Sequence, residues 1–204
     1  MNLITLIYFV LVTTFTPGPN NISSASFGMV YGYKRTLPYM YGIVAGFFLI
    51  MLACAVLSKT LIQVLPSIEV YMKYFGAGYI LWLAWGSLHA DYSITSNNRS
   101  RGQFRKGFLL QLLNPKVIVY GLTLYSTFLV SISNRFDYLV LTAILFAATT
   151  FCAISSWALF GAGISKHLKS ASLKNTINIF LSLLLVYTAI DLSGILRAWI
   201  NDLI

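Results

Sequence analysis

Two short proline motifs stand inside apolar segments of this chain. The first contains two prolines that bracket a glycine, with polar side chains on both sides: Thr16, Pro17, Gly18, Pro19, Asn20 and Asn21. Proline lacks a backbone N–H and clashes with the preceding turn, so this motif predicts a broken helix. Inside a membrane, the freed carbonyl groups need protein or a wet cavity to satisfy them. The two asparagine amides can both donate and accept, which suits a zwitterionic ligand, although a simple packing kink is the alternative.

The second motif is Asn114-Pro115-Lys116, about nine residues into another apolar segment. Nine residues of helix place it roughly 13 Å from the end of that segment. A lysine at the centre of a membrane costs on the order of 2.5–3.5 kcal/mol on insertion scales. Binding of a substrate carboxylate by Lys116 would account for that cost. The alternative is that Lys116 extends to the headgroups from a shorter helix.

One carboxylate, Asp191, lies well within an apolar run. It is a candidate to carry a coupling proton or to attract a substrate amine, since ionisable groups inside membranes usually serve function. The alternative is a position near the outer interface, paired with Arg197. No nucleophile–histidine–carboxylate set, phosphate loop or metal-binding pattern can be assembled within the apolar segments. We therefore expect a protein that is not an enzyme and that uses no metal or cofactor.

The composition explains where these residues must lie. The 204 residues are 58% hydrophobic and 9% charged, whereas a soluble protein has about 25% charged residues. Because a spanning helix needs about 20 apolar residues, we predict an all-α membrane protein with about six transmembrane helices in a single domain, 1–204. The predicted spans are 3–27, 38–60, 68–90, 107–131, 138–165 and 175–197. Cys54 and Cys152 lie within apolar runs and form no disulfide pattern.

Basic residues are responsible for the net charge of +9, and they lie at the ends of the apolar runs. This placement indicates membrane anchoring and argues against nucleic-acid binding. The odd-numbered connections hold the larger share: Lys34, Arg35, Arg99, Arg101, Arg105, Lys106, Lys166, Lys169 and Lys174. Since cationic loops stay in the cytoplasm, we predict that these connections are cytoplasmic and that both termini lie outside.

The two proline motifs occupy corresponding places in the two halves of the chain. A division near residue 98 leaves three predicted spans in each half, about 1–97 and 98–204, and the first span of each half carries a break. An odd number of spans per half gives the halves opposite topology, and paired broken helices in inverted halves indicate a transport site near the midplane. The spacing Gly42-x-x-x-Gly46 predicts close helix packing.

These residues resemble a known family. Thr16-Pro17-Gly18-Pro19-Asn20 and Leu113-Asn114-Pro115-Lys116 are similar to signatures of the LysE/RhtB family of amino-acid exporters, as is the stretch from Phe75 to Trp85. The stretch from Tyr120 to Phe128 and the apolar second span are most similar to the cysteine/O-acetylserine exporter branch. Many family members have an aspartate where this chain has Phe47, and this departure argues against a basic amino acid as substrate.

The resemblance implies export of small neutral amino acids or derivatives across the bacterial inner membrane by proton antiport. Lys116 would meet the substrate carboxylate, while Asn20, Asn21, Asn114 and backbone carbonyls would complete the site. The expected partners are an amino acid and membrane lipid, and no nucleic acid is expected. A homo-oligomer is compatible with these expectations. The alternatives are export of homoserine, threonine or lysine, or, in another class, a membrane-embedded enzyme or scaffold.

Overall fold

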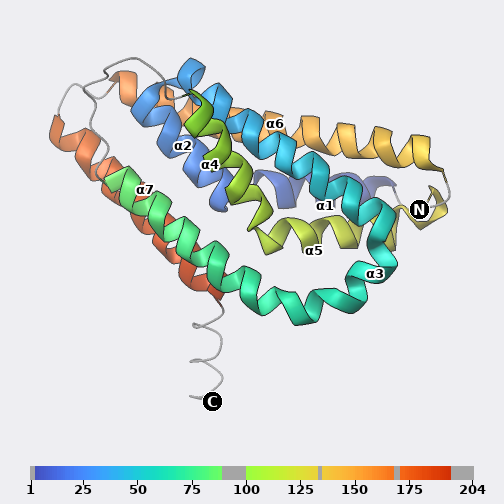
Figure 1. Cartoon of the computed structure of the whole chain (residues 1–204). Coiled ribbons are helices and arrows are strands. Elements are labelled where there is room, and N and C mark those ends of the chain that lie inside the picture. The colour runs from blue at the N-terminus through green and yellow to red at the C-terminus, as the bar shows by residue number, and fades with distance from the viewer. Residues whose placement is uncertain (1–2, 89–99, 133–134, 168–170, 194–204) are drawn as a thin grey trace.

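The structure, a computed structural model, describes residues 3–88, 100–132, 135–167 and 171–193, and for some helical residues it describes only the backbone. Within these ranges every regular element is helical (Figure 1). The main helices are α1 (Leu3–Phe15), α2 (Pro19–Tyr31), α3 (Tyr33–Leu88), α4 (Ser100–Leu112), α5 (Pro115–Thr123), α6 (Phe136–His167) and α7 (Ala171–Ser193). A π-helical turn, Leu124–Phe128, and a 3-10 turn, Val130–Ile132, follow α5. The all-α prediction is confirmed for the described residues.

Both predicted helix breaks are present. The axes of α1 and α2 meet at an angle of 47°, and those of α4 and α5 meet at 58°. Each of these pairs is apolar and long enough to cross a membrane as one bent span. Two unbroken helices, Tyr33–Leu57 and Phe136–Ile164, meet the same requirement. Length and composition therefore support up to four crossings in the described residues, and the count of six stays a prediction.

Helix α3 departs from the predicted boundaries. A loop was expected between spans 38–60 and 68–90, but helical structure continues from Tyr33 to Leu88. Only Leu57 leaves helical geometry, with φ −108° and ψ 16°, and the chain folds back there into two arms, Tyr33–Leu57 and 58–88 (Figure 1). A single non-helical residue is enough to change direction, and it leaves fewer backbone groups without intrahelical partners than a loop would.

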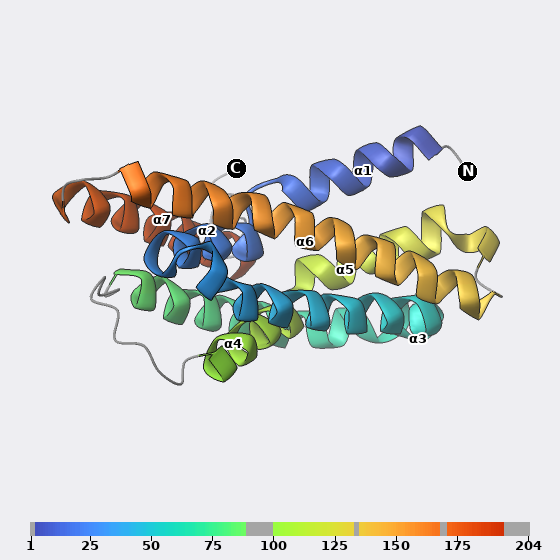
Figure 2. The same cartoon turned by 90° about the horizontal axis from the view of Figure 1, so that it is seen from above.

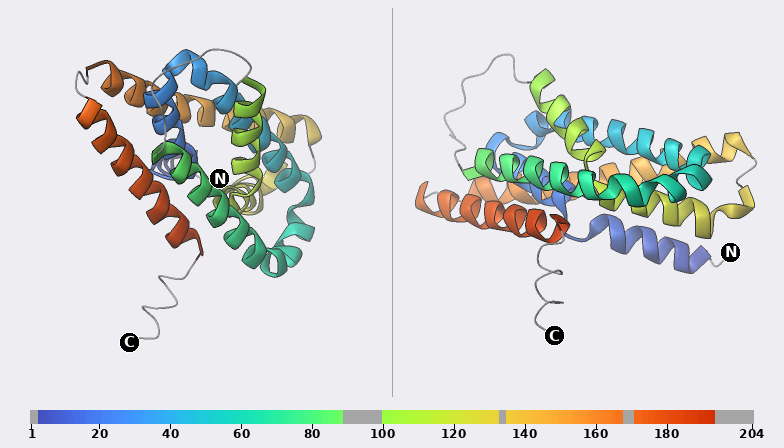
Figure 3. Two further views of the ribbon diagram at one scale, coloured as in Figure 1. Left: turned by 60° about the vertical axis from the view of Figure 1, so that its left-hand side comes forward. Right: turned by 60° about the horizontal axis from the view of Figure 1, so that its bottom comes forward.

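The described apolar core forms two clusters. One lies between α1, the first arm of α3, α5 and the first half of α6, and includes Met51, Leu124 and Ala143. The other joins α2, both arms of α3, α4, α6 and α7, and includes Met29 and Ile80. Figures 2 and 3 show α2 and α4 at one end of the molecule and α1 and α5 at the other, with α7 beside the second arm of α3. The breaks lie between the two ends.

Glycines allow the helix backbones to touch at the α2 and α4 end. A Cβ atom at Gly28 would meet the carbonyl of Ala158, and one at Gly161 would meet the carbonyl of Ala25, so α2 and α6 cross in direct contact. Gly42 and Gly107 provide the equivalent crossing of α3 with α4. The close packing predicted at Gly42 is therefore confirmed. Both crossings join the first half of the chain to the second.

Candidate binding site at the two helix breaks

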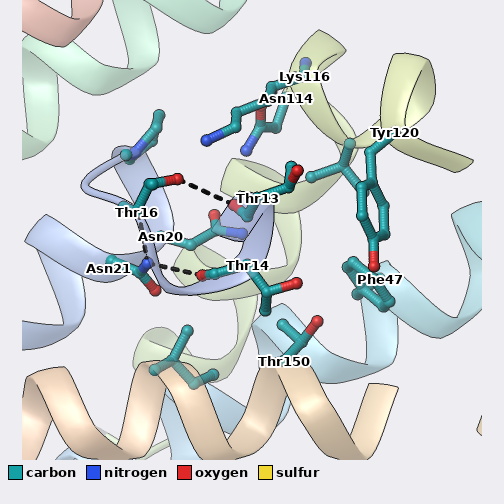
Figure 4. A pocket seen from close by; sticks show the side chains of 14 residues that line it. Thr13, Thr14, Thr16, Asn20, Asn21, Phe47, Asn114, Lys116, Tyr120 and Thr150 are labelled. Atoms are coloured by element: carbon teal, nitrogen blue, oxygen red, sulfur yellow. Dashed lines mark hydrogen bonds between the residues drawn. The ribbon is translucent and has the colours of Figure 1, made fainter. Parts of the chain in front are cut away.

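The two breaks face one cavity. Its volume is about 50 Å³, which is room for a few water molecules or part of a small polar solute. Figure 4 shows side chains converging on it from the two breaks, α3 and α6. The lining residues are Thr13, Thr14, Thr16, Gly18, Pro19, Asn20, Asn21, Phe47, Asn114, Lys116, Val117, Tyr120, Thr150 and Ile154.

Asn21 closes the first break. Its side-chain Nδ2 donates to the carbonyl oxygens of Thr14, at 2.9 Å, and of Thr16, at 2.8 Å (Figure 4). These carbonyls lie just before the two prolines, where the helical hydrogen-bond pattern is interrupted. A buried asparagine thus provides the internal partner that an interrupted helix needs in a membrane. Asn21 supports the break as well as lining the cavity.

The second break is closed in a different way. Asn114 is the residue before α5, and its Oδ1 accepts a hydrogen bond from the backbone N–H of Lys116, at 3.2 Å. The backbone N–H of Val117 donates to the Asn114 carbonyl, at 3.1 Å. The first amides of α5 therefore have partners already, and Asn114 is a helix cap. By contrast, Gly18 precedes α2 and offers no side-chain cap to its first turn.

Lys116 extends from the second break to the first. Its Nζ lies 3.5 Å from the position that a Cβ would take on Gly18, and Figure 4 shows it above the break that Thr16 and Asn20 border. Among carboxylates whose side chains the structure describes, only Asp137 occurs, and it pairs with Arg135 at 2.8 Å. Within the described part of the chain, then, no acidic side chain neutralises Lys116.

Gln111 is a site residue that the sequence analysis missed. Its Oε1 accepts from Asn20 Nδ2 at 2.7 Å, and the glutamine side chain is fully buried. It lies against Gly46, where an added Cβ would come within 2.9 Å of the Gln111 Cβ. The available signal was a glutamine one helical turn before Asn114 in an apolar segment. The lining residue Thr150 carried no comparable signal, because α6 contains other threonines at similar positions.

The structure brings together seven of the nine residues predicted to form the site: Thr16, Gly18, Pro19, Asn20, Asn21, Asn114 and Lys116. Pro17 and Pro115 do not line the cavity. Pro17 lies in the first break and is exposed, whereas Pro115 is buried as the first residue of α5. The side chain of Asp191 lies outside the described residues, so its proposed coupling role stays a prediction.

Comparison with known proteins identifies the family of this chain. The family described as LysE type translocator matches residues 11–194. A cysteine/O-acetylserine efflux protein of Salmonella typhimurium is 34% identical over 186 residues, covering 89% of this chain and 92% of the relative. The protein of the same name from Escherichia coli K12 is 32% identical over 182 residues, with the same coverage. No solved structure matches the chain. The chain therefore belongs to the LysE type translocator family.

Proposed function

We propose that this protein is a secondary transporter that exports small neutral amino acids or their derivatives, with cysteine and O-acetylserine as the favoured substrates. The observation that carries the proposal is the shared cavity, where two broken helices meet and Lys116 from one reaches Gly18 of the other. Discontinuous helices that present polar groups to a central cavity are characteristic of secondary transporters. The names of the relatives support the substrate class.

The start of α2 and Lys116 suit a carboxylate. Helix N-termini carry a partial positive charge and unpaired N–H groups, which favour anions. Gly18 has no side chain that could cap the first turn of α2, so the backbone N–H groups of Asn20 and Asn21 receive no side-chain hydrogen bond from it. Adding the ammonium of Lys116 at the same point produces a local positive charge that an α-carboxylate would neutralise. The capped N-terminus of α5 is less available for this role.

Phe47 favours a neutral substrate side chain. It lines the cavity from α3, is 4% exposed and lies against Tyr120, with the ring centroids 6.1 Å apart. Val117 and Ile154 add further apolar surface to the lining. A cationic side chain in this place would lose its hydration without gaining a carboxylate partner, which is costly. A small uncharged side chain, such as that of cysteine, does not incur this cost.

The proposed setting is the bacterial inner membrane, with several passes and both termini outside. Of the basic residues assigned to cytoplasmic connections, Lys34 and Arg35 lie in the first turn of α3, and Arg105 and Lys106 lie on α4. These helices gather at the end of the molecule that holds the glycine crossings (Figure 2). In this orientation the crossings close the cytoplasmic end, and alternating access requires the two three-helix halves to separate there.

The proposal is tested by reconstitution. Purified full-length protein in liposomes is expected to exchange internal labelled cysteine or O-acetylserine for external unlabelled substrate, above the rate of protein-free liposomes. Labelled lysine, homoserine and threonine, tested in the same vesicles, separate the favoured substrates from the alternatives. Absence of flux for every amino acid tested would contradict the exporter function.

Proton coupling is a separate part of the proposal, with Asp191 as the proposed proton carrier. Asp191→Asn keeps the size of the side chain but cannot change charge. We expect the variant to retain exchange at equal pH on both sides and to lose the acceleration of net export caused by a pH gradient. A gradient effect equal to that of the wild-type protein would show that Asp191 does not carry the proton.

A further inference from the structure

We propose that Asn20 and Thr150 form a neutral oxygen pole that receives the α-ammonium group of the substrate. This inference rests on the proposed function and assigns roles to Thr150 and Gln111 that neither the motifs nor the relatives indicate. It concerns the part of the cavity between Asn20 at the first break and Thr150, which lies opposite Lys116 (Figure 4). The proposed site would select zwitterions even though its described lining contains no carboxylate to bind the ammonium group.

Two oxygen atoms at the cavity have no hydrogen-bond partner: Asn20 Oδ1 and Thr150 Oγ1. Both atoms are buried, Thr150 is only 4% exposed, and both residues line the cavity. Buried polar atoms in proteins are nearly always hydrogen-bonded, and leaving them unpaired is unfavourable. Two such atoms from different helices at one cavity therefore indicate a ligand that supplies hydrogen-bond donors.

Gln111 holds one end of the Asn20 amide. Its Oε1 accepts from Asn20 Nδ2 at 2.7 Å, and in this orientation of the two amides Asn20 Oδ1 and Gln111 Nε2 are left without partners. Gly46 makes room for the glutamine, since a side chain there would meet Gln111 Cβ and Cγ. An amide oxygen can only accept hydrogen bonds, so the ligand must donate to it. Gln111 is thus a positioning residue for Asn20.

Thr150 lies on the opposite side of the site from Lys116, with Asn20 between them (Figure 4). A zwitterionic amino acid carries its ammonium and carboxylate on the same carbon, so one molecule can face both groups at once. With the carboxylate at Lys116 and the start of α2, its ammonium is directed to Asn20 Oδ1 and Thr150 Oγ1.

A neutral pole also has consequences for charge. The ammonium group is bound by uncharged oxygens, while the carboxylate is bound by one lysine, which is the balance that suits a substrate with an uncharged side chain. A second cationic group would find no carboxylate among the described lining residues, and Phe47, Val117 and Ile154 would add to the cost of removing it from water. The inference therefore names the substrate class as α-amino acids with small uncharged side chains, recognised through both charged groups.

Thr149 offers a matched control for Thr150 on the same helix. Its Oγ1 donates to the Leu145 carbonyl of its own helix at 2.9 Å, and it does not line the cavity. Thr150→Val and Thr149→Val each replace one hydroxyl group by a methyl group and preserve the shape of the side chain. Only the first change removes an atom of the proposed pole.

The test uses full-length protein in liposomes and three competitors of labelled cysteine exchange: cysteine, cysteamine, which lacks the carboxylate, and 3-mercaptopropionate, which lacks the ammonium. Thr150→Val is expected to weaken competition by cysteine and cysteamine about tenfold or more, the usual effect of losing a hydrogen bond to a charged group, and to leave 3-mercaptopropionate unchanged. Gln111→Met should show the same pattern to a smaller extent. Thr149→Val should match the wild-type protein for all three compounds.

Ligand-induced thermal stabilisation of the detergent-purified proteins separates the two proposals, because it does not require transport. Binding with the expected pattern but without flux would count against the exporter function alone. Equal behaviour of Thr150→Val and Thr149→Val, equal weakening of all three compounds by Thr150→Val, or no binding by the wild-type protein would each overturn the ammonium pole.

Discussion

Lys116→Ala is expected to abolish transport at low substrate concentration while the amount of protein in the membrane stays unchanged. The ammonium of Lys116 lies at Gly18, where α2 begins without a side-chain cap. Loss of a hydrogen bond to a charged group costs about 1.5–3 kcal/mol, or roughly tenfold to hundredfold in binding. The variant also leaves the substrate carboxylate with only the partial charge of the helix. The measurement is cysteine exchange in liposomes at a concentration below the half-saturating value.

Lys34→Ala is the control for this change. Lys34 is exposed and follows α2 at the end of the molecule that holds the glycine crossings, away from the cavity. Lys34→Ala removes the same charge and the same side chain as Lys116→Ala, so general effects of charge on insertion or expression appear in both variants. Full exchange by Lys116→Ala, with normal dependence on substrate concentration, would remove Lys116 from the site and leave the carboxylate to α2 alone.

Gly161→Ala is expected to lower both stability and transport, although it adds only one methyl group. The new Cβ would fall against the backbone carbonyl of Ala25, and a backbone cannot turn aside as a flexible side chain can. Helices α2 and α6 must therefore move apart. Overpacking of this kind costs about 1–3 kcal/mol, and we expect a lower melting temperature in detergent together with slower exchange.

Gly163→Ala is the matched control, since it is on the same helix and nothing lies within 4 Å of a Cβ at that position. Its melting temperature should equal that of the wild-type protein or exceed it, because alanine favours helix more than glycine does. If both variants melted at the same temperature, the close crossing of α2 and α6 would not exist in the membrane protein. If the Gly161→Ala protein were stable but failed to exchange substrate, the substitution would act by hindering the movement of the two halves.

The sequence alone was informative about features that depend on neighbouring residues. Apolar segments without charges predicted an all-helical membrane protein, and the proline motifs predicted both breaks, because a missing N–H and a ring clash act within one helical turn. The signatures at Thr16–Asn20 and Leu113–Lys116 also identified the family. Where the prediction of local structure failed, at the bend of α3, one non-helical residue replaced an expected loop.

The tertiary structure decided which side chains share the cavity and what each one does there. Thr150 and Phe47 come from helices distant in sequence from both breaks, and periodicity alone does not distinguish them from other residues on apolar helices. Asn21 and Asn114 look alike in sequence, yet one bonds the carbonyls of a break and the other caps a helix. The sequence determined that the helices break, because that effect is local. Only the packing of the two halves determined that the breaks meet, because that depends on contacts such as those at Gly28, Gly42, Gly107 and Gly161 between segments far apart in the chain.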